Sequence, residues 1–336
     1  KIYSIMTDVL LMIPEHYSAR QKPKNLSKED EILFAHQFLK KIPQTTLEKV
    51  INANILGDCI FNFSSFKFFA KYTHVEGLSA WQKFLRLRFL LLPKFKINKG
   101  VWIIDNWSYE YFHWLTDALP RLIVAEEYIE NHEILLPSKF RKSPYVDSLK
   151  VFNFNISFFN SKYPVSVKEL IIPSHTAPTG NYNKDVINKL RKRFNQNSVK
   201  VIPSKKIFVS RGKARFRKIS NEAEVIRLVM SFGYEVHYFE DYSFRDQVSL
   251  MQQATHLIGL HGAGLTNMLF MPENGKVLEL RNANDDHNNC FYALASDLGH
   301  EYYYLLNQGD AADTHFVNIT VRTEELASVL QQIDND

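Results

Sequence analysis

A glycine-rich segment in the last third of the chain, Gly259–Asn267 with the sequence GLHGAGLTN, limits the possible folds most strongly. It follows an apolar run typical of a buried strand, Thr255–Gly259, and it runs into Leu265–Met271, which can open a short helix. A strand, a glycine turn and a helix start together form a common anion site. Glycine lets the backbone approach a phosphate, and the first helical amides point at it. A tight turn with a purely structural role is the alternative.

The segment matches neither of two widespread phosphate-binding fingerprints. It is not GxGxxG, and it lacks the Lys and Ser or Thr that end a P-loop. Its side chains still offer hydrogen bonds, from an imidazole, a hydroxyl and an amide. The residues predicted to hold an anion here are His261, Gly262, Ala263, Gly264, Thr266 and Asn267.

Strands and helices alternate around this turn. Strands are predicted at Lys206–Arg211, Gly233–His237, Thr255–Gly259, Lys276–Leu280 and Tyr302–Leu305, and helices at Ala223–Phe232, Phe244–Ala254 and Asn289–Leu298. This order predicts a doubly wound parallel sheet with ligands at the carboxyl ends of its strands. Ser210 and Arg211 lie at such an end, before a basic loop with Arg217 that suits a diphosphate. Glu279 ends another strand, where an acid can bind a ribose hydroxyl. A surface loop and a salt-bridged or capping acid are the structural alternatives.

An aromatic block in the first half carries a histidine and a carboxylate four residues apart. It follows Val101–Ile104, a predicted buried strand, and it starts a helix. On that helix His113 and Asp117 share one face, which suits general base catalysis with Asp117 taking the proton and His113 orienting it. An ordinary surface pair is the alternative. Pro120 ends this helix, kinks it or opens the next one.

The length of 336 residues suits two domains. Strands predicted at Glu133–Pro137 and Val167–Pro173 extend the α/β pattern into the first half. The segment Ser174–Asn183 is rich in turn-forming residues and marks the boundary. We therefore expect a domain at 1–180, a second at 181–320 and a closing helix at 321–336.

The composition limits the classes of ligand and partner that this protein can have. A net charge of +5 favours an anionic ligand or a membrane surface. Trp81–Leu92 mixes apolar and basic residues, which fits a membrane or partner helix or a core helix with a basic edge. Cys59 and Cys290 lie far apart, which indicates a reducing compartment. Basic residues are scattered and no nucleic-acid module motif occurs, so no nucleic-acid partner is expected. Val9–Pro14 is too short for a membrane span and is expected to be a buried strand.

Three segments, taken in order, resemble glycosyltransferase family 61. They are Phe112–Arg121, then Ser210 and Arg211 with Arg217, then His261–Asn267 followed by Glu279. The resemblance covers roughly residues 100 to 305, and no motif accounts for the first hundred residues. It implies an α/β, GT-B-like architecture, with two Rossmann-like domains facing across a cleft. The N-terminal domain would be on the acceptor side and the C-terminal domain would bind a nucleotide sugar.

The resemblance also implies an inverting transfer that needs no metal and no cofactor besides the nucleotide-sugar donor. The one Asp-x-Asp spacing, Asp334–Asp336, lies at the extreme C-terminus, where a donor site is not expected. Arginines and backbone amides would then neutralise the leaving diphosphate. The expected donor-binding residues are Ser210, Arg211, Arg217, Glu279 and the six residues of the glycine turn. Asp117 is the expected base with His113 beside it, and Asp105, Glu110 and Asp241 are the next candidates.

The expected acceptor is a glycan or a lipid-linked glycan. The composition, without a recognisable signal or span, favours a bacterial cytoplasmic enzyme of capsule or lipopolysaccharide synthesis. Contact with the inner membrane through Trp81–Leu92 is an extension of this hypothesis. A catalytically inactive nucleotide- or carbohydrate-binding module of the same fold is the alternative function.

Overall fold

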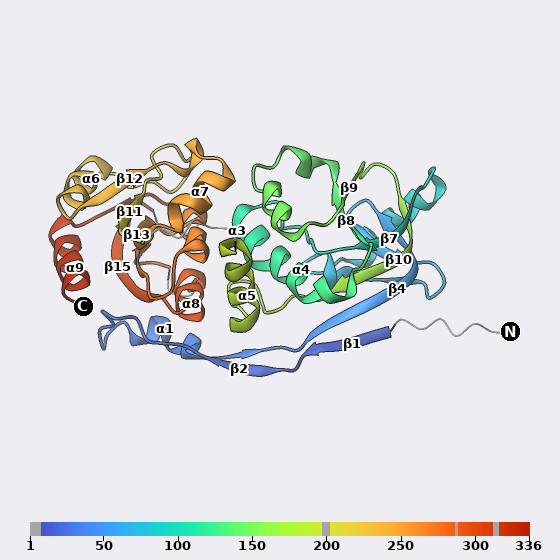
Figure 1. Cartoon of the computed structure of the whole chain (residues 1–336), viewed down its shortest axis with the longest axis horizontal. Coiled ribbons are helices and arrows are strands. Elements are labelled where there is room, and N and C mark those ends of the chain that lie inside the picture. The colour runs from blue at the N-terminus through green and yellow to red at the C-terminus, as the bar shows by residue number, and fades with distance from the viewer. Residues whose placement is uncertain (1–7, 197–201, 286–287, 312–315) are drawn as a thin grey trace. The chain divides into compact units, whose positions relative to one another are not determined.

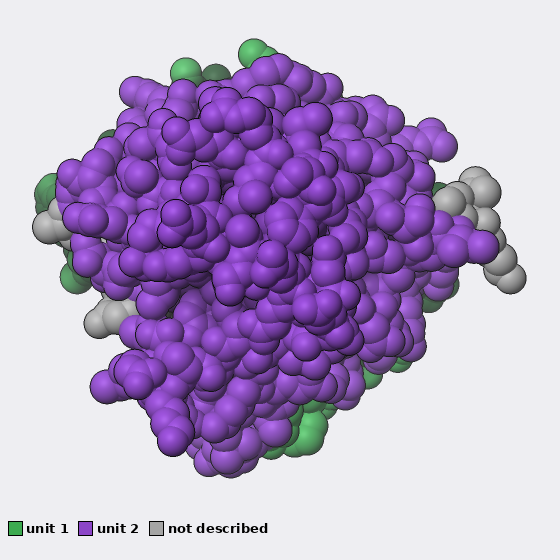
Figure 2. Space-filling model, turned by 90° about the vertical axis from the view of Figure 1, so that its left-hand side faces the viewer, with its two compact units in different colours: residues 1–16, 42–179 green, residues 17–41, 180–336 purple. Residues whose placement is uncertain are grey.

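The computed structural model describes residues 8–196, 202–285, 288–311 and 316–336, which form two compact units (Figures 1 and 2). The first unit comprises the residues up to His16 together with Ile42–Thr179. The second comprises Tyr17–Lys41 and Gly180–Asp336. The chain is an α/β protein, as predicted, and each unit is built on its own main sheet.

The second unit contains the predicted doubly wound sheet. Its order is β12-β11-β13-β14-β15-β16, and the first five of these strands run parallel. The strands are β11 (Lys205–Val209), β12 (Tyr234–His237), β13 (Ala254–Leu260), β14 (Lys276–Asn282), β15 (Glu301–Gly309) and the antiparallel β16 (Ile319–Thr320). Because β12 and β13 lie on opposite sides of β11, the chain reverses its direction of winding between β11 and β13.

Helices cover both faces of this sheet. On one face, α6 (Glu222–Ser231) and α9 (Thr323–Asn335) bury Val225, Leu326 and Leu330 against strand residues that include Phe208 and Ile258. On the other face lie α5 (Lys184–Asn195), α7 (Phe244–Met251), α8 (Cys290–Asp297) and the 3₁₀ helix η8 (Ala263–Phe270). Side chains alternate between the two faces along each strand, so both faces of the central strands are apolar.

Residues 17–41 belong to the second unit, which differs from the expected division at residue 180. The segment contains β2 (His16–Ala19), α1 (Glu31–Phe38) and β3 (Leu39–Ile42), and β2 pairs with β3. Phe34 of α1 is fully buried and its ring lies 4.9–6.2 Å from the rings of Tyr292, Tyr302 and Tyr304. Arg20 forms a buried ion pair with Asp297 at 3.0 Å. Because of these long-range contacts, residues 17–41 pack with the second unit, although they are close in sequence to the first. The later boundary, after Thr179, lies within the segment Ser174–Asn183 that was predicted to separate the domains. Helix α9, predicted as a separate closing helix, packs on the sheet of the second unit.

The sheet of the first unit is mixed. Its order is β6-β5-β4-β10-β7-β8-β9, with β1 also beside β4. Strands β7 (Phe95–Val101), β8 (Glu133–Pro137), β9 (Ile156–Phe159) and β10 (Val165–Pro173) are parallel to one another. Strands β1 (Asp8–Ile13), β5 (Cys59–Asn62) and β10 run antiparallel to β4 (Thr45–Leu56), and β6 (Lys67–Phe68) runs antiparallel to β5.

The expectation of a Rossmann-like first domain therefore applies only to its parallel half. The first hundred residues add hairpin strands in place of further strand–helix–strand units. Gly57, with φ at +71°, forms the tight turn between β4 and β5. Strand β1 is mostly exposed, so the expectation that Val9–Pro14 is a buried strand is wrong about burial.

The helices of the first unit are short. They are η1 (Ala70–Tyr72), α2 (Ala80–Leu87), η2 (Arg88–Leu91), α3 (Tyr111–His113), the π-helical turn η3 (Trp114–Ala118), α4 (Leu119–Ala125), η4 (Glu126–Tyr128), η5 (Ser138–Lys142) and η6 (Val146–Phe152), while η7 (Phe239–Asp241) belongs to the second unit. No residue of α2 or η2 is buried, so the alternative of a core helix at Trp81–Leu92 is wrong. Within the described ranges, no helix combines the length and apolarity needed to cross a membrane. Cys59 and Cys290 are both free and buried.

Candidate functional site

The glycine turn lies at the point where the second sheet reverses its winding. Ser210 and Arg211 directly follow β11, and His261 and Gly262 directly follow β13, its parallel neighbour. In open α/β sheets, ligands bind outside the carboxyl ends of the two strands at which the strand order reverses. The topology thus brings together two segments that are 50 residues apart in the sequence, and both were predicted as anion-binding.

Arg211 is held across this turn by backbone carbonyls. Its Nε donates to the carbonyl of Arg217 at 2.9 Å, and its Nη2 donates to the carbonyl of Phe216 at 3.0 Å. A Cβ atom at Gly262 would lie only 2.4 Å from Nη1 of Arg211. Glycine is therefore needed at position 262 to give the guanidinium its place, which is a packing reason and not a backbone one.

The two arginines at this turn have acidic residues in their surroundings, since the charge of Glu240 acts on Arg211 and that of Asp285 acts on Arg217. In the part of the chain that the structure describes, neither Arg211 nor Arg217 forms a salt bridge. Burial and the neighbouring charge of Arg217 lower the pKa of Arg211 to about 10. Burial also lowers the pKa of Arg217. Both stay protonated at neutral pH, so the turn is a half-buried cationic site that an anion would stabilise.

Ser210 shapes the loop instead of facing a ligand. Its hydroxyl donates to Oε1 of Glu222 at 2.7 Å and accepts from the amide of Gly212 at 3.0 Å. The residue is buried. Its predicted role in donor binding is therefore indirect, through the position of the loop that carries Arg211.

Glu279 does not lie where the sequence placed it. Strand β14 continues to Asn282, so Glu279 is in the middle of the strand and not at its end. Its carboxylate is fully buried, one oxygen pairing with Nδ1 of His261 and the other accepting from the hydroxyl of Tyr302 at 2.5 Å. A ribose hydroxyl has no access to either oxygen, because the carboxylate is fully buried. The predicted direct contact is thus replaced by the alternative of a paired acid, which orients His261.

The ionised state of Glu279 is well supported by its neighbours. Burial alone would raise its pKa, but the charge and hydrogen bond of His261 lower it below the usual value, with help from Arg281 and Tyr302. The opposite nitrogen of His261, Nε2, lies 3.2 Å from Nδ2 of Asn288. The imidazole is therefore fixed by hydrogen bonds at the opening of the turn.

The remaining residues of the turn divide into exposed and buried positions. Thr266 and Asn267 are fully buried, and Nδ2 of Asn267 donates to the carbonyl of Gly264 at 3.1 Å. The side chain of Asn267 therefore holds the turn, whereas the buried hydroxyl of Thr266 has no hydrogen-bond partner among the described residues. Ala263 and Gly264 are partly exposed and open η8, where the first amides have no partner within the helix. The contact surface for an anion is thus Arg211, Arg217, His261 and these backbone amides.

In the first unit, His113 and Asp117 form a hydrogen-bonded pair. Nδ1 of His113 lies 2.8 Å from Oδ2 of Asp117, to which Thr179 Oγ1 also donates at 3.3 Å. The π-helical turn η3 lies between α3 and α4 and carries Asp117, and such turns are frequent at functional sites. Pro120 stands in the first turn of α4, so it opens the next helix.

The two side chains of this pair differ in exposure. The side chain of Asp117 is 3% exposed, whereas that of His113 is 19% exposed. The imidazole can therefore meet a substrate, and the carboxylate stands behind it. In this geometry the carboxylate orients the imidazole, and among the described residues Nε2 of His113 has no hydrogen-bond partner.

A second Asp–His pair lies at the corresponding point of the first sheet. Asp105 follows β7 and His175 follows β10, its parallel neighbour, and Nε2 of His175 lies 2.7 Å from Oδ2 of Asp105. Two backbone amides and the hydroxyl of Ser108 donate to the other oxygen at 2.8–2.9 Å. Burial would raise the pKa of Asp105, but the His175 hydrogen bond and the charge of Arg121 place it well below its usual range.

Sequence reasoning ranked Asp105 as a reserve base and missed His175. The available signal was its position, two residues after the end of the predicted strand Val167–Pro173. Of the other reserve candidates, Asp241 is paired with the side chain of Lys213, and Glu110 is exposed next to α3. Over the described residues, no group of three or more His, Cys, Asp or Glu side chains is placed to hold a metal ion.

Comparison with known proteins adds independent information. The sequence model of the family described as Glycosyltransferase 61 matches residues 111–278, which is 168 of 336 residues, or half of the chain. The chain is also 34% identical over 92 residues to the EGF domain-specific O-linked N-acetylglucosamine transferase of Bos taurus, covering 26% of this chain and 17% of that protein. It is 35% identical over 106 residues to the protein of that name from Drosophila melanogaster, covering 30% of this chain and 20% of that protein. The matched segments thus span about a fifth or less of the length of these relatives.

Proposed function

Since this chain belongs to the glycosyltransferase 61 family, we propose that it transfers a sugar from a nucleotide-sugar donor to a glycan acceptor. The observation that carries this proposal is the cationic turn of the second unit. There Arg211, Arg217 and the amides of Ala263 and Gly264 lie at the strand ends where nucleotides bind in doubly wound sheets. A leaving nucleoside diphosphate is the anion that this chemistry suits.

The reaction we propose is a single displacement with inversion at the anomeric carbon. An acceptor hydroxyl gives its proton to Nε2 of His113 while its oxygen bonds to the anomeric carbon. The bond from that carbon to the diphosphate breaks at the same time, and the electron pair leaves with the diphosphate. Arg211, Arg217 and the turn amides neutralise the new charge, so no metal is required. Asp117 stabilises the imidazolium that forms.

This assignment of roles is tested with two conservative variants. His113→Asn keeps a donor near the position of Nδ1 and removes Nε2, whereas Asp117→Asn keeps the shape and removes the charge. We expect both to abolish transfer, by about 100-fold or more, while binding of nucleoside diphosphate is unchanged. If His113→Asn keeps near-normal turnover and Asp117→Asn does not, the carboxylate itself is the base.

The donor is best identified with a screen of nucleotide sugars, with hydrolysis followed by mass spectrometry. UDP-N-acetylglucosamine is the first to test, because the relatives are named as N-acetylglucosamine transferases. Turnover of any donor would show that the protein is an enzyme and not a catalytically inactive nucleotide- or carbohydrate-binding module. Such a module would bind nucleoside diphosphate without turnover. No nucleic-acid ligand is proposed, and oligonucleotides serve as the negative control.

We further propose that the acceptor is a membrane-linked glycan. The segment formed by α2 and η2 is helical and amphipathic and has no buried residue, and the first two residues of strand β7, which follow it, are exposed. Trp81 and Phe84 stack with ring centroids 5.6 Å apart and are 65% and 63% exposed. The other exposed apolar side chains are Leu85, Leu91, Leu92 and Phe95, and exposed cations are Arg88, Lys94, Lys96 and Lys99. Aromatic and basic side chains on one segment suit the interface of an anionic bilayer.

The membrane proposal is tested by sedimentation with vesicles. We expect binding to phosphatidylglycerol vesicles, little binding to phosphatidylcholine vesicles, and loss of binding in the double variant Trp81→Ala, Phe84→Ala. Ile32→Ala, at an exposed apolar position of α1 outside this segment, is the matched control. Equal sedimentation of the double variant and the wild type would contradict the membrane proposal.

We also propose that the process is capsule or lipopolysaccharide synthesis at the cytoplasmic face of a bacterial inner membrane. Loss of that glycan in a deletion strain tests this proposal.

A further inference from the structure

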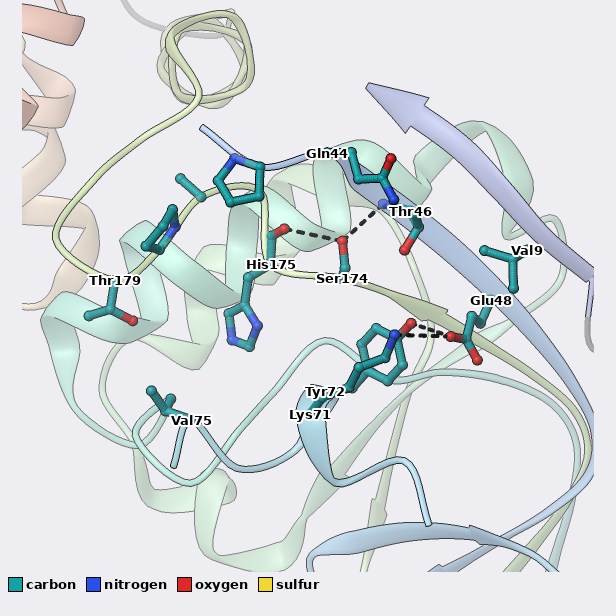
Figure 3. A pocket seen from close by; sticks show the side chains of 13 residues that line it. Val9, Gln44, Thr46, Glu48, Lys71, Tyr72, Val75, Ser174, His175 and Thr179 are labelled. Carbon is teal, nitrogen blue, oxygen red and sulfur yellow. Dashed lines mark hydrogen bonds and ion pairs between the residues drawn. The ribbon is translucent and has the colours of Figure 1, made fainter. Parts of the chain in front are cut away.

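A cavity of about 600 Å³ opens beside the second Asp–His pair in the first unit (Figure 3). That volume lies within the range of about 300 to 1,000 Å³ that is typical of small-molecule sites. The wall is formed by β1, β4, η1 and the segment after β10. None of the residues that the sequence predicted as functional lines it.

The imidazole of His175 faces this cavity with one nitrogen available. Its Nε2 is engaged with Asp105, which is ionised and fully buried at the side chain. Across the described ranges, Nδ1 of His175 has no hydrogen-bond partner. Nε2 carries the hydrogen that Asp105 accepts, so in this tautomer Nδ1 is the ring nitrogen left to accept a hydrogen bond from the cavity.

A second buried acceptor lies on the opposite wall. Glu48 is 3% exposed, and its Oε1 accepts from the hydroxyl of Tyr72. Its Oε2 has no hydrogen-bond partner among the described residues, and the nearest cation, Nζ of Lys67, is 3.7 Å away. Lys71 lies 3.4 Å from Oε1 (Figure 3). A buried carboxylate oxygen without a donor is costly unless a ligand supplies one.

The charge of the cavity decides which ligand it suits. The fully buried Arg121, which does not line the cavity, is close to Asp105, Tyr72 and Asp117, and its two terminal nitrogens have no partner in the described structure. Taken together, the three cations Arg121, Lys67 and Lys71 equal in number the three carboxylates Asp105, Asp117 and Glu48, so these groups leave no net positive charge for an anion. The lining offers acceptors, His175 and Glu48, and donors, Lys71 and the amide of Gln44, while Pro43, Ala177 and Pro178 add apolar surface.

We propose that this cavity binds an uncharged, hydroxyl-rich sugar ring, with His175 Nδ1 and Glu48 Oε2 accepting from its hydroxyls. Thr179 connects the cavity to the pair proposed for catalysis, because it lines the cavity and its hydroxyl donates to Asp117 at 3.3 Å. The cavity is therefore the acceptor subsite. That identification rests on the proposed function, whereas the binding of a sugar does not.

Two variants test the cavity by different means. His175→Gln can keep a donor toward Asp105, while its acceptor, Oε1, no longer lies at the position of Nδ1. Ala177→Phe adds a ring at a partly exposed wall position. The surface substitution His16→Gln is the matched control. Melting temperatures and UDP binding establish that each variant is folded and that the second unit is intact.

Binding is measured by saturation-transfer NMR with methyl glycosides of glucose, galactose, mannose, xylose and N-acetylglucosamine. We expect at least one glycoside to bind the wild type and the control equally. His175→Gln should weaken that binding by roughly 3- to 10-fold, and Ala177→Phe should abolish it. If no glycoside binds the wild type, or if both variants bind as the wild type does, the inference is overturned.

Failure of the proposed function has a different signature. In that case no nucleotide sugar is hydrolysed or transferred, while glycosides still bind the cavity and respond to both variants. If transfer is detected, His175→Gln should raise the acceptor KM with little change in kcat or in donor hydrolysis. A fall in kcat with an unchanged acceptor KM would overturn the role of His175 in acceptor binding.

Discussion

The substitution Gly262→Ala is expected to weaken diphosphate binding through Arg211 and not through the backbone. The backbone at Gly262 is extended, with φ at 161° and ψ at 171°, which alanine can adopt. The new Cβ would lie 2.4 Å from Nη1 of Arg211, whereas ordinary contacts begin at 3.4 Å, so the guanidinium must move by about 1 Å. That shift disrupts its hydrogen bonds to the carbonyls of Arg217 and Phe216, now 2.9 and 3.0 Å long.

The magnitude follows from these two bonds. Each is worth about 0.5–1.5 kcal/mol net, so the loss of both, about 1–3 kcal/mol, should weaken UDP binding by roughly 5- to 150-fold, since 1.4 kcal/mol is a factor of ten. Arg211→Ala removes charge-assisted bonds to the diphosphate at about 1.5–3 kcal/mol, or roughly 10- to 150-fold. Because both changes act on one guanidinium, the double variant should bind UDP no more weakly than Arg211→Ala does.

The assay is isothermal titration calorimetry with UDP and with uridine on the two single variants and the double variant. Uridine affinity should stay within about 2-fold of the wild type, because the nucleoside does not contact the arginines. Additive losses in the double variant, or equal losses for UDP and uridine, would refute the mechanism in which Gly262 keeps space for Arg211. Thermal denaturation of each variant excludes global unfolding as the cause.

Three further outcomes are expected. Glu279→Gln should lower UDP affinity by roughly 10-fold, since His261 loses its charged partner; unchanged affinity in calorimetry would count against the orienting role. Asp105→Asn should destabilise the fold by about 2–3 kcal/mol at pH 7 in urea denaturation. Folding lowers the pKa of Asp105, so the stability that its carboxylate contributes is present above the unfolded pKa of about 4 and is lost as pH falls below that value. The free energies of unfolding of the wild type and of Asp105→Asn should therefore become equal in acid. A difference that grows as pH falls would contradict this. Arg121→Met should cost about 3–5 kcal/mol, because Asp105 and Asp117 lose their buried counter-charge, and a stability equal to that of the wild type would oppose it.

Local signals in the sequence were sufficient for the second half of the fold. The strands near β11, β13 and β14 have apolar runs that end at polar or glycine residues, and each was predicted within a few residues of its observed bounds. The site residues Arg211 and His261 could be predicted for the same reason, since both directly follow a strand. Their contribution as ligand contacts stays a prediction that the experiments above address.

The errors come from contacts between distant residues. Glu279 was placed at a strand end because β14 contains polar residues after Leu280, and only its burial against Tyr302 shows that it faces the interior. Similarly, α1 was assigned to the first domain by its position in the sequence, although Phe34 is buried among tyrosines more than 250 residues away. No local pattern encodes such pairings.

By itself, the sequence determined the alternation of strands and helices, the glycine turn and the family to which the chain belongs, because each depends on residues within a few positions of one another. The tertiary structure alone decided that His175 pairs with Asp105 and that His113, not Asp117, reaches solvent. The physical reason is strand order. Which strand ends are neighbours depends on how the whole sheet is packed, and exposure depends on everything packed around a side chain.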